Sequence, residues 1–129
     1  MDEPIWIIKD VAIAIHYRQL AEHGGSEGIR DEGLLKSALC RPRNQFAYGN
    51  PSIFTLAAAY GYGIVNNHPF VDGNKRTSYV VSLTFLLLNS YVIQASPVEK
   101  YQTWIKLASS QLSEAELADW FEKNSQNRT

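Results

Sequence analysis

Apolar residues recur at helical spacing along most of the chain. Between residues 10 and 22 they return every three or four positions, which predicts a helix, and the double glycine at residues 24–25 is expected to end it. A second helix is predicted to begin after Asp31, a favourable N-cap residue, and to stop at Pro42. Residues 41–50 are then expected to form a longer connection to the next helix.

Two later helices carry clear start signals. Ser96 and Ser113 each stand three residues before a glutamate, Glu99 and Glu116. This spacing is typical of a capping box, in which each side chain binds the other residue's backbone N–H. The second of these helices is expected to reach about Lys123.

Extended structure is expected only in short pieces. Residues 5–8 are β-prone, residues 91–93 resemble a short extended tail, and residues 124–129 form a polar end that we expect to fray. Six helical segments and almost no strand predict an all-α fold, a compact helical bundle in a single domain over residues 1–129.

The most apolar segment, residues 79–93, has to be weighed against a membrane span. A spanning helix needs about 20 apolar residues, and the pair Asn89-Ser90 interrupts this run too early. A helix that is apolar all round lies in the middle of a fold. We therefore expect residues 79–88 to form a central helix surrounded by the others.

Length and composition narrow the class of protein. With 129 residues, 45% of them apolar and 19% charged, the chain suits one globular domain. Its net charge of −1 gives no electrostatic case for binding nucleic acid. The single cysteine, Cys40, cannot form an intramolecular disulfide and is expected to be a buried apolar residue, and the first residues lack the features of a secretion signal. These features predict a cytoplasmic protein.

Polar groups suited to chemistry gather in one stretch, His68-Pro69-Phe70-Val71-Asp72-Gly73-Asn74-Lys75-Arg76. A helix over residues 52–67 is expected to end before Pro69, because the residue before a proline avoids the α region. Gly73 and Asn74 are expected to open the next helix. Because the free N–H groups of a helix start attract anions, this junction predicts a phosphate site.

The polar residues of the junction each have a structural and a chemical interpretation. His68 is either a structural histidine or a general base that takes a proton from an incoming hydroxyl. Asp72 is either an N-cap or a carboxylate that holds a Mg²⁺ ion bridging phosphate oxygens. Gly73 is either an ordinary turn residue or one whose missing Cβ lets a phosphate approach the backbone. We favour the chemical interpretation because these groups occur together.

Lys75 and Arg76 support the phosphate interpretation. Two cations are unfavourable at a helix start, where the helix dipole is positive, unless an anion compensates them. Arg76 can grip two phosphate oxygens at once, whereas Lys75 acts as a compact charge. Phe70, in contrast, is predicted to be a structural anchor whose ring pins the loop to the core.

The pattern of residues 68–76 resembles the signature loop of the Fic/Doc superfamily, and its lysine is similar to the death-on-curing branch. Residues 24–35 and the pair Arg41-Pro42 resemble the upstream part of that branch. The resemblance implies a compact α-helical Fic fold and Mg²⁺-dependent transfer from a nucleoside triphosphate to a protein hydroxyl. It also implies the roles, with His68 as the general base, Asp72 as the metal ligand, Gly73 and Asn74 as the phosphate-binding turn, and Arg76 as a phosphate clamp.

Two departures from the AMP-transferring Fic pattern bear on the reaction. That pattern has glycine at position 75 and a second arginine at position 79, where this chain has Lys75 and Tyr79. The change is expected to let the triphosphate lie the other way round. The resemblance then implies kinase activity, with transfer of the γ-phosphate of ATP to elongation factor Tu and arrest of translation. Two alternatives stay open, namely AMP transfer to a protein hydroxyl and a catalytically inactive binding module.

The resemblance also implies a regulatory partner. Members of the branch are toxins paired with a small Phd-like antitoxin, whose disordered end folds into a groove on the toxin. The Ser/Thr-x-x-x-Glu-Gly/Asn motif of self-inhibited relatives is absent from this sequence. Control by a second protein is therefore expected.

Overall fold

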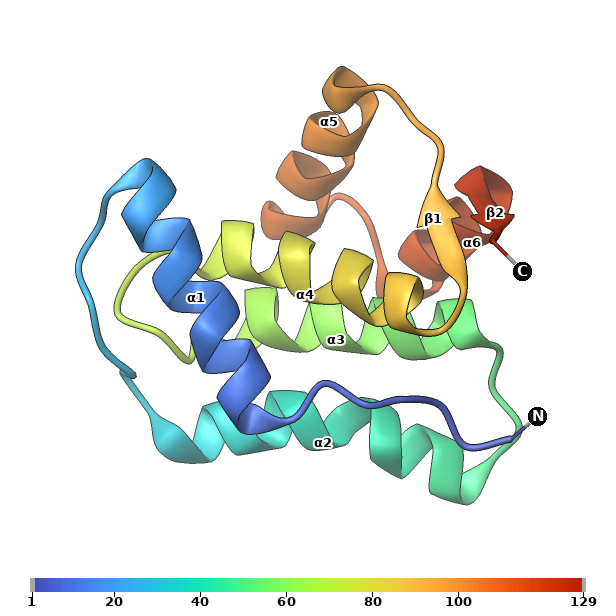
Figure 1. The fold of residues 1–129 in the computed structure, drawn as a ribbon, viewed down its shortest axis with the longest axis horizontal. Coiled ribbons are helices and arrows are strands. Elements are labelled where there is room, and N and C mark those ends of the chain that lie inside the picture. The colour runs from blue at the N-terminus through green and yellow to red at the C-terminus, as the bar shows by residue number, and fades with distance from the viewer. Residues whose placement is uncertain (1, 129) are drawn as a thin grey trace.

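The computed structural model describes residues 2–128, which fold into six helices and a small two-stranded ribbon (Figure 1). In chain order the elements are α1 (Lys9–His23), α2 (Glu32–Tyr48), α3 (Ile53–Asn67), α4 (Asn74–Leu88), β1 (Tyr91–Ile93), α5 (Pro97–Ala108), α6 (Glu114–Asn124) and β2 (Ser125–Asn127). The predicted all-α class is confirmed.

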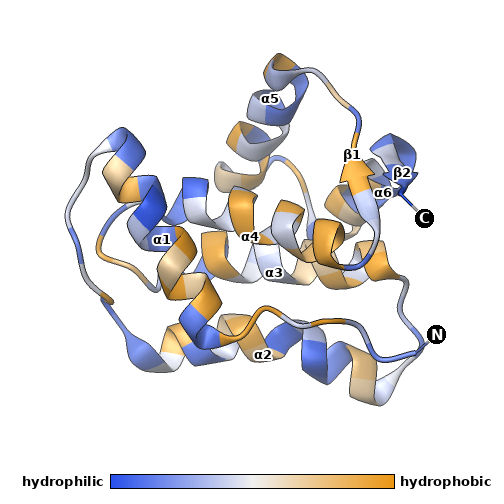
Figure 2. Ribbon diagram, viewed as in Figure 1, coloured by the Kyte–Doolittle hydropathy of each residue, from blue (hydrophilic) through white to orange (hydrophobic). Residues whose placement is uncertain are grey.

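The helix in the middle of the bundle is α3, which contacts α2, α4, α5 and α6 (Figure 1). Every residue from position 56 to position 65 is buried except Tyr62. The prediction that α4 is the central helix was wrong, since its last turn exposes Leu87 at 45%. Small residues allow the other helices to pack closely around α3. A Cβ on Gly63 would lie 3.3 Å from Cα of Ala38, so the glycine lets α2 approach closely. Figure 2 shows apolar residues along both α3 and α4.

Buried hydroxyl groups join α4 to its neighbours. Ser78 donates to the carbonyl of Gly61 (2.8 Å) and Ser82 donates to that of Ala57 (3.0 Å), so both serines hold α4 on α3. Trp104 of α5 donates its indole N–H to the Ser78 hydroxyl (3.1 Å). Satisfied polar groups in a core fix one arrangement of the helices, so α4 has a rigid base.

The prediction that Pro42 ends the second helix was wrong, because α2 continues through it to Tyr48. The continuation is stabilised by contacts far along the chain. Arg41 forms an ion pair with Glu114 of α6, and Gln45 donates to the same carboxylate (3.1 Å). The hydrogen bond from Arg41 to Glu114 raises the pKa of Arg41. One turn on, the Phe46 ring packs edge-on against Trp6 with ring centroids 5.6 Å apart.

The N-terminal segment, predicted to be β-prone at residues 5–8, forms no strand. It runs as extended chain along the bundle and is fastened by side chains instead. The Asn89 side chain pairs with both the N–H (2.8 Å) and the carbonyl (3.0 Å) of Ile5, and the Tyr60 hydroxyl accepts the N–H of Ile7 (2.9 Å). Burial raises the pKa of Tyr60 to about 12. These side chains satisfy polar backbone groups that a neighbouring strand would otherwise satisfy.

The frayed C-terminal end was also predicted incorrectly over the residues that the structure describes. Residues 125–127 form β2, which pairs antiparallel with β1 through Tyr91↔Asn127, Val92↔Gln126 and Ile93↔Ser125. Thr129, the last residue of the predicted frayed end, lies outside the described residues. The pairing secures the chain end to the segment that follows α4.

Both predicted serine caps are present, but only one forms the full box. At α6 the Ser113 hydroxyl accepts the N–H of Glu116 (3.1 Å) and the Glu116 carboxylate accepts the N–H of Ser113 (2.9 Å). At α5 the Ser96 hydroxyl accepts the N–H of Glu99 (3.1 Å). The Glu99 carboxylate accepts a hydrogen bond from the Ser96 hydroxyl (3.3 Å) instead of from the Ser96 N–H. No helix among residues 2–128 has the length and apolarity that crossing a bilayer requires.

Candidate active site

The loop between α3 and α4 begins at a residue in an unusual backbone conformation. His68 is the C-cap of α3 and lies in the left-handed region (φ 48°, ψ 57°), and its N–H donates to the carbonyl of Ile64 (3.1 Å). A non-glycine residue with positive φ is uncommon, and such residues concentrate at functional sites. The turn ends the helix at Asn67, as Pro69 predicted, and leaves the His68 side chain exposed.

The loop before α2 holds the loop after α3. Arg30 donates from Nε to the carbonyl of His68 (2.7 Å) and from Nη2 to that of Asn67 (2.8 Å). Its own N–H donates to the carbonyl of Pro69 (2.7 Å), and Ile29 and Phe70 form an antiparallel bridge. A guanidinium at the end of a helix satisfies free carbonyls and suits the helix dipole. Arg30 therefore fixes the backbone that carries His68.

Phe70 and Asn74 close the loop from inside. Phe70 is 1% exposed, as a ring that anchors the loop to the core would be. The Asn74 carboxamide accepts the N–H of Phe70 (2.9 Å) and donates to the Phe70 carbonyl (2.9 Å). Because this pair occupies the Asn74 side chain, any contact from Asn74 to a phosphate comes from its backbone N–H.

The start of α4 has the open geometry that the sequence predicted. Gly73 is the N-cap, lies in the left-handed region (φ 76°), and leaves the helix start without a side-chain cap. Asp72 is therefore not the N-cap. Its exposed carboxylate accepts the N–H of Gly73 (2.8 Å) through Oδ1 and that of Ser26 (3.2 Å) through Oδ2. The two loops thus position this carboxylate beside the helix start.

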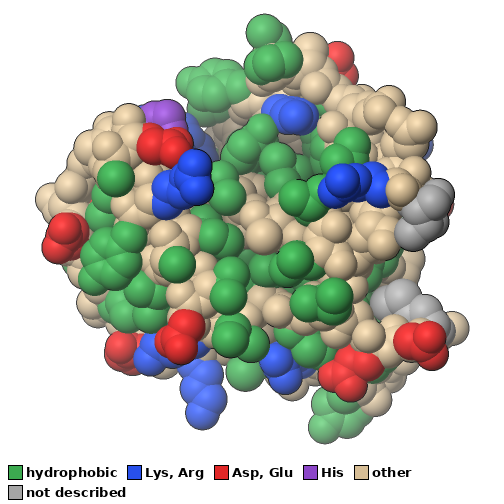
Figure 3. Space-filling view, in the orientation of Figure 1, with side chains coloured by type: hydrophobic (Ala, Val, Ile, Leu, Met, Phe, Trp, Pro, Cys, Tyr) green, Lys and Arg blue, Asp and Glu red, His purple; other side chains and the backbone are tan. Residues whose placement is uncertain are grey.

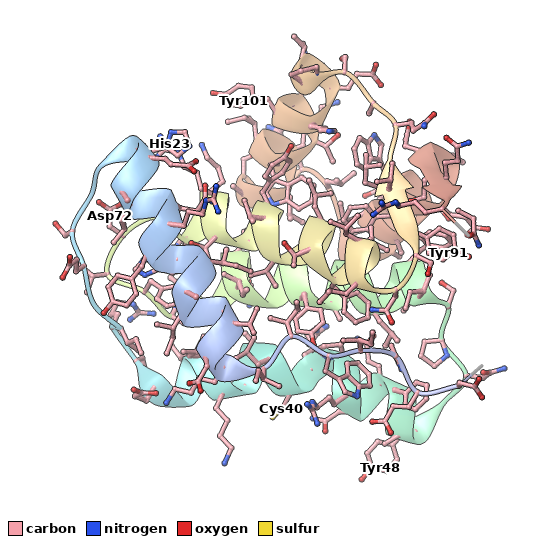
Figure 4. All side chains as sticks on the ribbon, viewed as in Figure 1. His23, Cys40, Tyr48, Asp72, Tyr91 and Tyr101 are labelled. Atoms are coloured by element: carbon pink, nitrogen blue, oxygen red, sulfur yellow. The ribbon has the colours of Figure 1, made fainter. Side chains whose placement is uncertain are left out.

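Lys75 and Arg76 are exposed and line a cavity of about 380 Å³ between α1, α4 and α5. Figure 4 shows His23 of α1 and Tyr101 of α5 on opposite sides of this hollow, and in the same orientation Figure 3 shows basic and apolar side chains around it. The Lys75 Nζ lies 5.8 Å from the centroid of the Tyr101 ring. The wall is aromatic and the rim is basic, a combination suited to an anion with an apolar part.

His68 lines a different cavity, also of about 380 Å³, on the α3 and α5 side. Its lining includes Tyr62, Leu107 and Ser110 and shares no residue with the cavity of the two cations. The structure therefore brings Asp72, Gly73 and His68 onto one loop, and places His68 and the two cations at two separate cavities.

The model of the Fic/DOC family matches residues 6–86, a stretch that contains both loops of this site. The chain belongs to the Fic/Doc family. It is 40% identical over 75 residues to "Toxin Doc" of Mycolicibacterium smegmatis, which covers 56% of this chain and 57% of that protein. It is 30% identical over 108 residues to "Protein kinase doc" of Escherichia phage P1, which covers 83% of this chain and 85% of that one. The alignment with the first relative thus spans little more than half of its length.

The Fic/Doc family implies a magnesium ion, and the donors present suit one that arrives with its substrate. Among the described residues no group of three or more histidine, cysteine, aspartate or glutamate side chains could hold a metal. Magnesium is often bound by one or two carboxylates together with substrate phosphates and water. The single carboxylate of Asp72 fits that arrangement and does not fit a closed metal cage.

Two residues that contact this loop, Arg30 and His16, were not predicted as site residues from the sequence. Arg30 belongs to the upstream segment that resembles the family, but its contacts to residues 67 and 68 depend on how two distant loops meet. His16 lies on the buried stripe of α1 together with Ala12 and Leu20. A histidine in an apolar stripe of helical period was the available signal.

Proposed function

We propose that this chain is a toxin of the Fic/Doc type that transfers the γ-phosphate of ATP to a hydroxyl of a translation factor, elongation factor Tu by resemblance, in the cytoplasm. The relatives' names, "Toxin Doc" and "Protein kinase doc", support this proposal. The observation that carries it is the uncapped start of α4, with Gly73 in the left-handed region and Lys75 and Arg76 beside it.

In the proposed reaction the donor phosphates lie at the start of α4. The free N–H groups of the helix and the charges of Lys75 and Arg76 would balance the triphosphate. A Mg²⁺ ion held by Asp72 would neutralise charge on the phosphate oxygens. Asp72 is positioned for that task by the N–H groups of Ser26 and Gly73.

His68 would act on the acceptor. The acceptor hydroxyl gives its proton to the imidazole as its oxygen forms a bond to the γ-phosphorus. The bond from that phosphorus to the bridging oxygen breaks, and ADP leaves with the electron pair. The cavity that His68 lines gives the acceptor an approach separate from that of the cations.

The test is transfer of label to purified elongation factor Tu in the presence of Mg²⁺. With ATP labelled at the γ position we expect label on the factor, and with ATP labelled at the α position we expect none. Label from the α position alone would refute the phosphate transfer and establish AMP transfer instead. His68→Ala is the control: equal growth arrest by wild type and His68→Ala would support an inactive binding module.

The proposed regulation is by a Phd-like antitoxin. The hollow between α1, α4 and α5 combines the rings of Tyr79 and Tyr101 with the charges of Lys75 and Arg76, which suits an acidic segment with apolar side chains. A partner segment that orders on this surface would cover the two cations. A synthetic peptide of alternating acidic and apolar residues should inhibit transfer, and no inhibition would count against this form of control.

A further inference from the structure

We propose that His16 is a positioning residue for the proposed reaction: its Nε2–H holds the carbonyl of Asp72 and thereby sets the peptide plane that presents the N–H of Gly73 and the carboxylate of Asp72. The inference rests on the proposed function for its effect on turnover. Its geometric part rests only on contacts within the described residues.

The ring of His16 lies directly beneath the loop. It is 2% exposed and stacks on the anchor ring of Phe70, with centroids 3.9 Å apart and planes 8° from parallel. Its Nε2 lies 2.9 Å from the carbonyl oxygen of Asp72. A Cβ added to Gly73 would lie 3.8 Å from both Cδ2 and Nε2 of the ring. The His16 imidazole therefore contacts both the Phe70 ring and the Asp72 carbonyl, and it lies close to Gly73, the N-cap of α4.

The hydrogen-bond partner of Nε2 of His16, the carbonyl oxygen of Asp72, determines which ring nitrogen carries the hydrogen. A carbonyl oxygen only accepts, so Nε2 carries the hydrogen of this bond. A partly buried carbonyl that loses its donor is left with an unsatisfied acceptor, which is unfavourable. The imidazole N–H thus stabilises the inward orientation of the Asp72 carbonyl.

The orientation of the carbonyl determines the orientation of the next N–H. In a trans peptide the C=O of Asp72 and the N–H of Gly73 point in opposite directions. Because His16 holds the carbonyl inward, the N–H points outward, where it donates to the Asp72 carboxylate (2.8 Å). Without this contact the peptide between Asp72 and Gly73 can rotate. The Gly73 N–H and the Asp72 carboxylate would then turn away from the proposed phosphate site at the start of α4.

Substitutions can separate the hydrogen bond from the packing. His16→Phe keeps an aromatic ring for the stack on Phe70 and removes the donor, whereas His16→Gln loses the ring and keeps an N–H donor. Ser82→Ala is the matched control, because it also removes one buried hydrogen bond from the fold, to Ala57 on α3, away from the loop. All variants are compared with wild type for kcat, for KM of ATP and for thermal unfolding.

We expect His16→Phe to lower kcat about 10- to 100-fold, because small displacements of positioned groups have effects of this size, and His16→Gln to recover most of that loss. Ser82→Ala should lower the unfolding temperature and leave kcat within about twofold of wild type. Wild-type kcat in a folded His16→Phe would overturn the proposal. Equal loss in His16→Phe and His16→Gln would also overturn it, since it would assign the effect to packing.

Nuclear magnetic resonance tests the geometry without any turnover. The ring nitrogen shifts of wild type should show a hydrogen on Nε2 of His16, and the amide resonance of Gly73 should move in His16→Phe and stay in Ser82→Ala. A neutral ring with its hydrogen on Nδ1 would overturn the proposal even if His16→Phe failed to fold. If wild type transferred no phosphate, the proposed function would fail, while these resonances would still decide the role of His16 in the loop.

Discussion

The side chain of Asn74 and the backbone of Phe70 form a closed pair of hydrogen bonds, each 2.9 Å long, across the turn that precedes α4. One group of the carboxamide accepts and the other donates, so both polar groups of the Phe70 backbone are satisfied in a buried place. The pair makes the loop a closed unit whose shape is set before any ligand binds.

Replacing Asn74 by aspartate tests this pair with almost no change of shape. Asn74→Asp keeps the acceptor for the Phe70 N–H, but it loses the donor and turns a carboxylate oxygen toward the Phe70 carbonyl. We expect the free energy of unfolding to fall by about 2–4 kcal/mol, as for a buried polar group that loses its partner or an unpaired buried charge. Urea unfolding at neutral pH measures it. The exposed Asn44→Asp is the control, and an equal loss there would contradict the proposed pairing.

The contacts of the Asn74 side chain could not be predicted from the sequence. The motif predicted a phosphate-binding residue, and the fold uses the side chain as an internal brace. The motif did place the helix start at Gly73 and Asn74 correctly, because that start depends on residues close together in the chain. The use of one carboxamide depends on which backbone groups the turn brings within its reach.

A second prediction concerns the two glycines before Ser26. A Cβ on Gly25 would lie 2.9 Å from the Asp72 carboxylate and 2.9 Å from Leu20, whereas a Cβ on Gly24 would meet nothing within 4 Å. Both glycines have positive φ, at 125° and 79°. Alanine at either position therefore carries backbone strain of about 1–2 kcal/mol, and only Gly25→Ala displaces the carboxylate.

We expect Gly25→Ala to raise the Mg²⁺ concentration for half-maximal transfer about 10- to 100-fold, in the range seen when groups that orient a metal ligand are altered. Gly24→Ala should leave that concentration near the wild-type value at a similar loss of thermal stability. A titration of transfer rate against Mg²⁺ gives both numbers. If the two variants shifted it equally, strain in the loop would explain the effect and the position of Asp72 would not.

The capping box of α6 predicts a pH dependence of stability. The hydrogen bond from the Ser113 N–H lowers the pKa of Glu116 from its usual 4.5. A carboxylate with a lowered folded pKa contributes stability above the unfolded pKa and loses it as pH falls through the folded value. The contribution should therefore be complete above about pH 4.5 and vanish at more acidic pH.

Urea unfolding of wild type and Glu116→Gln over the acid range measures this contribution. Glutamine resembles the protonated side chain, so we expect a difference in the free energy of unfolding at neutral pH that disappears at low pH. Glu122→Gln removes a charge from the same helix away from the cap. The same pH dependence in that variant would assign the effect to the charge of α6 and contradict the role of the cap.

The errors in the predicted fold share a physical cause. Pro42 was expected to end a helix because proline removes a backbone donor and crowds the preceding turn, at about 3 kcal/mol in a helix interior. The pair between Arg41 and Glu114 joins residues 73 positions apart. Such long-range contacts offset the local penalty, and local sequence carries no sign of them. The pairing of β1 with β2 is of the same kind.

The last prediction separates the role of Lys75 from that of a general surface charge. Lys75 is exposed and its Nζ lies 5.8 Å from the Tyr101 ring, a contact worth about 0.5–1 kcal/mol at an exposed site. Lys75→Ala should therefore change the free energy of unfolding by no more than about 1 kcal/mol. We expect it to lower kcat/KM for ATP by about 10- to 100-fold, since cations beside a transferring phosphate act mainly on the charge of the transition state.

The control is Lys36→Ala, which removes another exposed lysine, from α2 and away from the loop. Steady-state rates at two salt concentrations complete the comparison, because an effect of net charge alone would appear in both variants and weaken together with added salt.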